Sequence, residues 1–420
     1  MDSLEDEVIK LHEWLRGKIE IKNRIPLDDA TKIASTQNHT GRNILELIYT
    51  PGVAYAAEQI SKNRKLVYNY TSKWNNVAIV CDGTRILGLG NIGPEAAIPI
   101  MEGKSVLFKL LAGVNAFPLC IATQNLEEIV TFVKAIEPGF GAINIEDIES
   151  PKVLELVQRL QDELEIPVFH DDQHGTAVVT LAGLLNSMKL LKKDIDKVKV
   201  VIAGAGSSGY GIFKLLHHAK FKDIIVADSH GALTKAEAKD AADDKPSTNP
   251  FKNEITSKSN PNNQSGNLKE ILKDADIFIG VTGQSNLLDD QMIRSMNNDP
   301  IIFALSNPNP EISPQNALDA GAKIVATGRS DYSNQVNNAL VFPYILRALL
   351  DTKANLITEN MLVAVAYTIA GLITEKELSE NFVIPRLNDP RLLYTIMQAV
   401  KDSNSNNSRE CKYDVRSDRH

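Results

Sequence analysis

The chain has 420 residues, of which 43% are hydrophobic and 23% are charged, proportions typical of a soluble globular protein with two or three domains. Its formal net charge of -8 argues against nucleic-acid binding, because a phosphate backbone requires a basic protein surface. No segment reaches the roughly 20 apolar residues that span a bilayer, and the acidic N-terminus differs from a secretory signal, so we expect a soluble, cytoplasmic protein without membrane contact.

The first strongly apolar segment, residues 77–81, predicts a strand that ends at Asp82. Residues 87–94 follow, and their glycines have the G-x-G-x-x-G spacing of many dinucleotide-binding loops. Pro94 ends this motif, and no acidic residue ends a strand about 20 residues later. We therefore interpret it as a tight glycine loop rather than the dinucleotide site, with a helix over residues 96–111 after it.

Two acidic pairs, Glu146-Asp147 and Asp171-Asp172, each follow a predicted strand, the first over residues 142–145 and the second over residues 166–169. Ser150-Pro151 opens a helix between the strands, which indicates a βαβ unit. Such a crossover makes the strands parallel, so both pairs converge at the carboxyl edge of the sheet, where α/β sheets bind ligands. Clustered carboxylates need a positive partner, and Mg²⁺ or Mn²⁺ suits oxygen ligands. The alternative is that these acids are ordinary turn and helix-capping residues.

A second glycine motif begins with the buried-strand pattern of residues 199–203. A G-x-G-x-x-G loop, a helical face, a strand over residues 224–227 and a final acidic residue follow in order, which is the full pattern of a dinucleotide-binding unit. The residues expected to contact the dinucleotide are Gly204, Ala205, Gly206, Ser207, Ser208, Gly209 and Asp228. Asp228 favours NAD, because no Arg or Lys follows it directly to hold a 2′-phosphate. NADP remains an alternative, since Lys235 is close in sequence.

The rest of the chain continues the α/β alternation and then becomes helical. We interpret residues 243–267 as a surface excursion, because they are rich in Asp, Lys, Ser, Asn and Pro. Strand patterns resume at residues 276–280, 301–305 and 323–326, which predicts an α/β fold with a doubly wound, Rossmann-like parallel sheet. The expected division is a substrate and metal domain over residues 1–175, a dinucleotide-binding domain over residues 176–350, C-terminal helices over residues 351–400, and a polar, disordered tail over residues 401–420.

Characteristic segments recur in one order along nearly the whole chain, from about residue 11 to residue 400. They are residues 11–12, 17–20, 49–54, 82–94 and 101–104, the two acidic pairs, the glycine loop at 204–209, residues 306–312 and 326–332, and Asn337-Asn338. Together these segments resemble the malic enzymes of the short prokaryotic type. Several long motifs in the right order are more specific than any one of them.

This resemblance implies the oxidative decarboxylation of L-malate to pyruvate and CO₂, with reduction of NAD or NADP, a bound Mg²⁺ or Mn²⁺, and decarboxylation of oxaloacetate on the same site. The implied metal ligands are Glu146, Asp147 and Asp172, and the implied catalytic residues are Lys104 as general base, Tyr49 as general acid and Asp171 in the substrate pocket. The implied substrate residues are Arg85, Asn307 and Asn338, the two asparagines also lying near the nicotinamide ribose. On pattern alone, Lys104 and Arg85 are ordinary surface charges and Tyr49 is a packed aromatic residue at a turn.

Other functions remain open on this sequence. A malolactic-type enzyme, which keeps NAD bound and releases lactate, would share all these residues, and so would an oxaloacetate decarboxylase. A catalytically silent dinucleotide-binding subunit would lack Tyr49, Lys104 or one of the metal acids, and all of them are present. The resemblance also implies a homodimer whose clefts borrow residues across the interface.

Two departures from the family pattern bear on the site. His174 stands where a glutamine is usual, either as a solvated residue at the helix start or as a residue that tunes the pH dependence or the neighbouring backbone. Tyr344 replaces a glycine and is expected to narrow the cofactor cleft.

Overall fold

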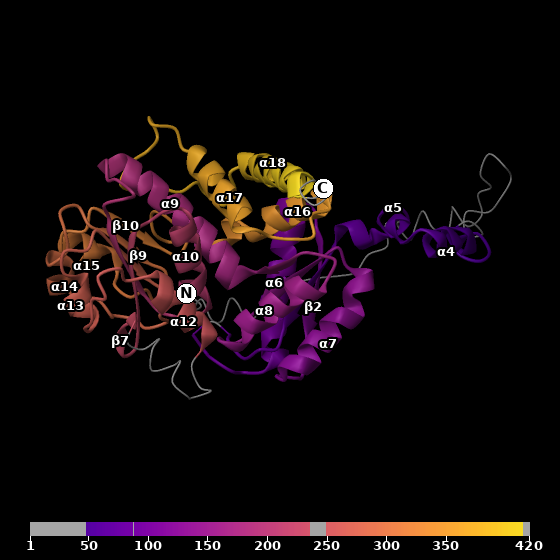
Figure 1. Ribbon diagram of the computed structural model, residues 1–420, viewed down its shortest axis with the longest axis horizontal. Coiled ribbons are helices and arrows are strands. Elements are labelled where there is room, and N and C mark those ends of the chain that lie inside the picture. The colour runs from indigo at the N-terminus through magenta and orange to yellow at the C-terminus, as the bar shows by residue number, and fades with distance from the viewer. Residues whose placement is uncertain (1–47, 87, 236–248, 415–420) are drawn as a thin grey trace, which may run out of the picture.

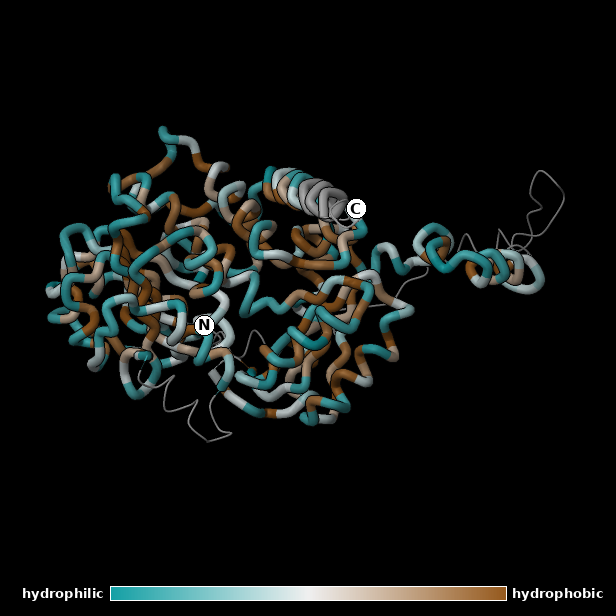
Figure 2. Tube along the Cα trace, in the orientation of Figure 1, coloured by the Kyte–Doolittle hydropathy of each residue, from teal (hydrophilic) through white to brown (hydrophobic). Residues whose placement is uncertain are grey.

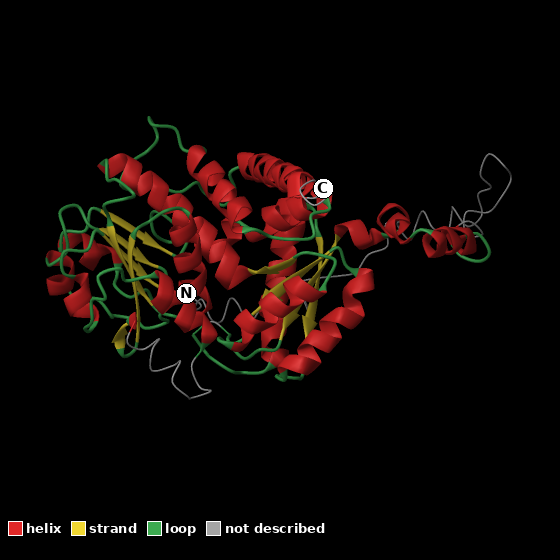
Figure 3. Cartoon of the chain, viewed as in Figure 1, coloured by secondary structure: helices red, strands yellow, loops and turns green. Residues whose placement is uncertain are grey.

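The computed structural model describes residues 48–86, 88–235 and 249–414. Two sheets form the body of the molecule, one built from each half of the chain, and helices lie around both (Figures 1 and 3). The expected α/β fold is confirmed. The family-like segments before residue 48, residue 87 of the first glycine loop, residues 236–248 and residues 415–420 lie outside the described residues.

The first sheet has four parallel strands in the order β2-β1-β3-β4. Its strands are β1 (Asn76–Cys81), β2 (Asn115–Cys120), β3 (Ala142–Glu146) and β4 (Val168–His170), and its connecting helices are α6 (Pro94–Ala112), α7 (Leu126–Ile136) and α8 (Lys152–Glu163). Every residue of β1 and β3 is buried, as expected for central strands that helices cover on both faces. Because β3 and β4 are parallel neighbours, the two acidic pairs lie at the same edge of this sheet.

The second sheet has six strands in the order β10-β9-β8-β5-β6-β7, and only the pairing of β6 with β7 is antiparallel. Its strands are β5 (Lys199–Ala203), β6 (Asp223–Asp228), β7 (Gly231–Ala232), β8 (Ile277–Gly280), β9 (Ile301–Ala304) and β10 (Ile324–Thr327). Its helices are α10 (Ser207–His218), α12 (Pro250–Lys258), α13 (Leu268–Leu272), α14 (Asp290–Arg294) and α15 (Pro314–Asp319). The chain leaves β5 toward β6 on one side and returns to β8 on the other, which makes the end of β5 the switch point where such sheets bind ligands.

Helix α9 (Thr176–Leu191) connects the two sheets and packs against α10 and α17 (Glu359–Gly371). It is buried on nearly all sides, because its sequence is apolar all round rather than on one face. Figure 2 shows hydrophobic residues concentrated along the strands of both sheets. Helices α16 (Phe342–Thr352) and α18 (Arg391–Asp414) pack on each other beside α17. In the part of the chain that the structure describes, none of the helices has the length and apolar character needed to cross a bilayer.

Several helix boundaries differ from the expected ones. Helix α6 begins at Pro94, two residues earlier than expected. Helix α8 begins at Lys152, with Pro151 as its N-cap, one residue later than expected. Helix α18 continues past residue 400 to Asp414, where a disordered tail was expected. The residues of this extension are polar but include no proline or glycine that would end a helix.

The segment before β1 forms an arm that projects away from the two sheets (Figure 1). It carries α4 (Val53–Lys62) and α5 (Val67–Tyr70), neither of which has a buried residue. Between residues 48 and 70, the exposed large hydrophobic side chains are Ile48, Tyr49, Val53, Tyr55 and Tyr70.

Candidate active site

Lys104 lies between two of the predicted acids. Its Nζ is 2.5 Å from Oε2 of Glu146, at the end of β3, and 2.6 Å from Oδ2 of Asp171, directly after β4. Helix α6 presents Lys104 to this edge of the sheet, and the Lys104 ammonium is 5.2 Å from the ring centre of Phe342. Glu146 and Asp171 are 2% and 0% exposed. The structure thus brings three of the predicted residues together in a buried cluster.

The charges in this cluster do not balance. Burial alone would lower the pKa of Lys104, but Asp171, Glu146 and Asp147 raise it well above its usual value. Burial raises the pKa of Glu146, and Asp171 and Asp147 raise it further against the opposing effect of Lys104. Burial raises the pKa of Asp147 to about 7, opposed by Lys104 and supported by Asp172 and Asp171. Arg85 also lowers the pKa of Asp147. One ammonium and one guanidinium cannot neutralise four neighbouring carboxylates, so the site favours additional positive charge.

Two oxygen atoms in the cluster are buried without a hydrogen-bond partner, Oδ2 of Asp147 and Oδ1 of Asp171. Such atoms cost free energy unless a cation or donor satisfies them, and carboxylate oxygens are the ligands that Mg²⁺ and Mn²⁺ prefer. Within the described residues, no three acidic, histidine or cysteine side chains already converge around one point, since Lys104 occupies the space between Glu146 and Asp171. The donor set therefore fits a divalent cation, provided that Lys104 releases these carboxylates.

A cavity of about 1050 Å³ connects the carboxyl edges of the two sheets. Its walls include Arg85 and Asp172 from the first sheet and the glycine loop and Asp228 from the second. The side chain of Arg85 reaches across toward the second sheet, where its Nη2 is 3.6 Å from the point at which a Cβ on Gly283 would lie. Arg85 and the predicted dinucleotide loop therefore face one shared cleft.

The glycine loop after β5 has the close packing that its sequence predicts. Gly204 has a φ of 112° and leaves 2.8 Å between its ideal Cβ position and the carbonyl oxygen of Val281. A Cβ on Gly209 would lie 1.8 Å from the carbonyl oxygen of Gly204. Only glycine fits at either position, so the backbone of this loop and the N-terminus of α10 stay open to a pyrophosphate.

The two predicted asparagines are not among the described residues that line the cleft. Asn307 follows β9 and is exposed. The next residue, Pro308, packs near Gly88 of the first glycine loop, and its Cδ is 3.2 Å from the ideal Cβ position of Gly88. Asn338 contacts Gly175, where its Cβ is 3.1 Å from the ideal Cβ position. The same ideal position is 2.5 Å from Oδ1 of Asp171, so Asn338 lies beside the acidic turn.

Both halves of this chain are similar in sequence to known proteins. Residues 29–161 match the family described as malic enzyme, N-terminal domain, and residues 173–401 match malic enzyme, NAD binding domain. The bifunctional malic/malolactic enzyme of Bacillus subtilis is 47% identical over 95% of this chain and 92% of that protein. The NAD-dependent malic enzyme of Geobacillus stearothermophilus is 44% identical over 96% of this chain and 79% of that protein. A crystal structure of NAD-dependent malic enzyme from Thermotoga maritima has 42% identity and a TM-score of 0.85, and the match covers 96% of this chain and 99% of that one.

The chain belongs to the malic enzyme family. This confirms the resemblance seen in the sequence and the prediction that the chain is an enzyme with an NAD-binding domain. Relatives described as NADP-dependent malic enzymes, such as that of Haemophilus influenzae at 39% identity, are also similar to it.

One predicted catalytic residue of this malic enzyme lies apart from the others. Tyr49 is 72% exposed and lies four residues before the start of α4, where its carbonyl accepts the backbone N–H of Val53. Helix α4 is on the projecting arm, whereas α6, which carries Lys104, is in the body of the molecule (Figure 1). The structure of the single chain therefore does not bring Tyr49 to the acidic cluster.

The two departures from the malic enzyme pattern have structural roles. His174 is buried against Phe169, so it is not a solvated residue at the helix start. Its Nδ1 accepts a hydrogen bond of 3.1 Å from the backbone N–H of His170, and burial lowers its pKa to about 3.

Tyr344 is also buried, and its hydroxyl donates to the carbonyl of Leu387 at 3.1 Å. Among the described residues that line the cleft, Tyr344 is absent, so the expectation that it narrows the cleft was wrong.

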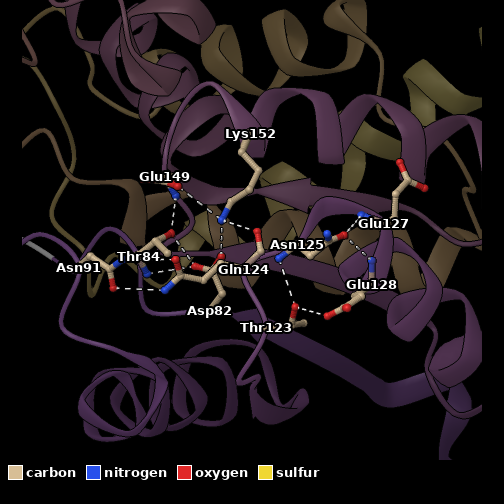
Figure 4. Close-up of polar contacts among 10 residues, drawn as sticks. All are labelled: Asp82, Thr84, Asn91, Thr123, Gln124, Asn125, Glu127, Glu128, Glu149 and Lys152. Atoms are coloured by element: carbon tan, nitrogen blue, oxygen red, sulfur yellow. Dashed lines mark hydrogen bonds and ion pairs between the residues drawn. The ribbon is translucent and has the colours of Figure 1, made fainter.

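A polar network that sequence reasoning missed supports the cleft of this malic enzyme (Figure 4). The fully buried Asp82 follows β1 and pairs with Nζ of Lys152 at 2.7 Å. Its other oxygen accepts hydrogen bonds from the backbone N–H and the hydroxyl of Thr84, at 3.0 and 2.6 Å. The Thr84 hydroxyl in turn accepts from the N–H of Glu149 at 2.8 Å, and the Arg85 N–H donates to the carbonyl of Asp147 at 3.1 Å.

This network ties the loop that carries Arg85 to the turn that carries Asp147. The only signal for it in the sequence is that Asp82 is a third acid at the end of a strand in the same sheet. The pairing with Lys152 depends on how α8 returns along the sheet, which local patterns do not specify.

We expect Lys152→Met to lower the free energy of unfolding by about 3 kcal/mol, because it leaves Asp82 charged and buried without its partner. Urea unfolding measures this change. Lys134→Met is the matched control, since the side chains of Lys134 and Glu163 are 48% and 33% exposed and such a pair is worth less than about 1 kcal/mol. Equal losses in the two variants would show that the Asp82 pair has no special structural role.

Proposed function

We propose that this malic enzyme converts L-malate to pyruvate and CO₂ with reduction of NAD or NADP. The observation that carries the proposal is the position of Lys104 between Glu146 and Asp171, at the edge of a sheet whose cleft is shared with a dinucleotide-binding loop. A base, a set of cation ligands and a hydride acceptor are the components that this reaction needs in one place.

The chain's own residues supply binding and proton transfer. When bound, the divalent cation supplies Lewis acidity at the substrate oxygens, and the dinucleotide accepts the hydride. Arg85 holds a malate carboxylate through its planar guanidinium. Glu146, Asp147 and Asp172 would hold the cation, and its charge would replace that of Lys104 beside these acids and so lower the pKa of Lys104. The Lys104 amine then accepts the proton of the malate hydroxyl. After CO₂ leaves, Tyr49 donates a proton to the enol carbon to form pyruvate.

A spectrophotometric assay tests this proposal with L-malate and Mn²⁺, and with NAD or NADP supplied in turn. We expect reduced dinucleotide and pyruvate to accumulate in equal amounts. One relative is described as a bifunctional malic/malolactic enzyme, so lactate is measured in the same samples. Lactate without reduced dinucleotide would assign the malolactic reaction instead, and the absence of both products would refute the proposed function.

We infer that the working form is a homodimer in which the arm of one subunit brings Tyr49 to the cleft of the other. The support is that α4 has no buried residue and that apolar side chains are exposed on α4 and shortly before it, including Tyr55 and Tyr49, each at 72% exposure. Exposed apolar groups clustered on a projecting segment favour burial against a partner.

Mixed dimers test this arrangement. Tyr49→Phe and Lys104→Met each inactivate a homodimer, but a heterodimer of the two variants contains one cleft with both residues intact, and we expect about half of the wild-type activity per dimer. Co-expression with two different affinity tags isolates the heterodimer for the assay. An inactive heterodimer would mean that Tyr49 and Lys104 act within the same subunit.

A further inference from the structure

Lys252 forms an ion pair with Asp228, the acidic residue at the end of β6 that the dinucleotide motif assigns to the ribose. The distance from Lys252 Nζ to Asp228 Oδ2 is 2.6 Å. Lys252 belongs to α12, within the segment that the sequence pattern assigned to a surface excursion. The structure instead returns α12 to the cleft, where Asn249, Lys252 and Asn253 line the wall beside Asp228.

The surroundings of Asp228 keep its carboxylate charged and fixed. Its Oδ1 accepts the backbone N–H of His230 at 2.8 Å, and its Oδ2 accepts from Lys252. Burial alone would raise the pKa of Asp228, but the hydrogen bonds from Lys252 and His230 hold it below its usual value. The side chain of Lys252 is 39% exposed, so its ammonium has room to leave Asp228 for another anion in the cleft.

The two nicotinamide cofactors make different demands on this position. NAD offers two ribose hydroxyls, which a carboxylate accepts as hydrogen-bond donors. NADP offers a 2′-phosphate, which a lone carboxylate repels and which therefore needs a cation beside it. A carboxylate with a movable ammonium at contact distance meets both demands.

We propose that Lys252 is the residue that admits the 2′-phosphate, so that this chain uses both NAD and NADP. With NAD, Asp228 holds the ribose hydroxyls and Lys252 stays on the outer oxygen of Asp228. With NADP, the ammonium turns to the phosphate and offsets the charge of Asp228. This inference deepens the proposed function and rests on it, because it concerns the cofactor end of the same cleft.

Lys235, the residue that its place in the sequence suggests for this role, lies elsewhere. Its side chain is exposed, and its backbone N–H donates to the side chain of Asn263 at 2.9 Å. Lys235 is not among the described residues that line the cleft. It therefore provides a control of the same residue type, seven positions after Asp228, without access to the ribose.

The test measures the binding of two cofactor fragments, 5′-AMP and 2′,5′-ADP, by isothermal titration calorimetry in the full-length protein. We expect Lys252→Met to weaken 2′,5′-ADP at least about tenfold, as is usual for losing a hydrogen bond to a charged group, and to change 5′-AMP less than about threefold. Lys252→Arg should restore most of the loss, because it keeps the positive charge, and Lys235→Met should leave both affinities unchanged. An unchanged affinity for 2′,5′-ADP in Lys252→Met, or an equal loss for both fragments, would overturn the proposal.

Turnover separates this inference from the proposed function. In the malate assay, Lys252→Met should lower kcat/KM with NADP at least about tenfold while that with NAD changes less than about threefold. Wild-type protein that binds both fragments but does not oxidise malate would refute the proposed reaction and leave the phosphate-binding role intact. If the wild type oxidises malate but Lys252→Met binds 2′,5′-ADP as tightly as the wild type does, only the role of Lys252 would be refuted.

Discussion

Lys104→Met is expected to lower kcat by about 10² to 10⁴, the range in which a single general acid or base contributes to catalysis. Methionine keeps the length of the side chain beside Phe342 but cannot accept the hydroxyl proton of malate. The charge cluster of Lys104 with Glu146 and Asp171 is also lost, so circular dichroism and thermal unfolding must show that the variant is folded before its rate is interpreted. The steady-state rate with saturating malate, Mn²⁺ and cofactor measures the effect.

Lys109→Met is the control for this substitution. Lys109 is on the same helix α6, it is exposed, and its ammonium bonds only to the side chain of Asn115 among the described residues, at 2.9 Å. We expect its kcat to stay within about twofold of the wild type, as for surface substitutions in general. A Lys104→Met enzyme that is folded and keeps more than a tenth of the wild-type kcat would exclude Lys104 as the base.

Asp147→Asn is expected to weaken Mn²⁺ binding at least about 100-fold and to lower kcat/KM in proportion. This loss exceeds the roughly 10- to 100-fold loss seen when a residue that only orients a metal ligand is removed. The amide has the shape of the carboxylate but neither its charge nor its affinity for a hard cation. Asp147 has a φ of 48°, a left-handed conformation that asparagine adopts as readily as aspartate. The backbone should therefore be retained, and titration with Mn²⁺ followed by electron paramagnetic resonance measures free metal directly.

Asp299→Asn matches this variant in chemistry and in backbone conformation. Asp299 has a φ of 54° and is exposed at the surface, so its substitution should change neither metal affinity nor activity. If Asp147→Asn bound Mn²⁺ as tightly as Asp299→Asn does, Asp147 would not be a metal ligand, and the unpaired Oδ2 of Asp147 would need another explanation.

The sequence predicted the parts of the cleft that depend on local order. Glu146 and Asp171 end neighbouring parallel strands because a βαβ unit has only one common arrangement, and the glycine loop before α10 tolerates no Cβ at Gly204 or Gly209. Both features follow from short segments whose spacing has a direct geometric meaning. The α/β fold was predictable for the same reason.

The remaining parts of the site depend on contacts between distant segments. The pairs of Asp82 with Lys152 and of Asp228 with Lys252 join residues 70 and 24 positions apart, and no periodicity records them. Lys252 was missed because the polar composition around it is typical of a surface excursion, whereas α12 packs through its few apolar residues, Ile255 among them. Tyr49 was expected near Lys104, but its place depends on how the arm meets a partner, which lies beyond the fold of one chain.

The turn after β4, which carries Asp171 and Asp172, packs directly against α10, the helix that follows the dinucleotide loop. A Cβ on Gly211 of α10 would lie 2.2 Å from the carbonyl oxygen of Gln173 in the turn after β4, so these two backbones are in direct contact. Close packing of this kind fixes the position of the acidic turn relative to α10. The acids that would hold the cation and the helix that would hold the pyrophosphate are therefore aligned by one backbone contact, and a side chain at Gly211 would disturb both together.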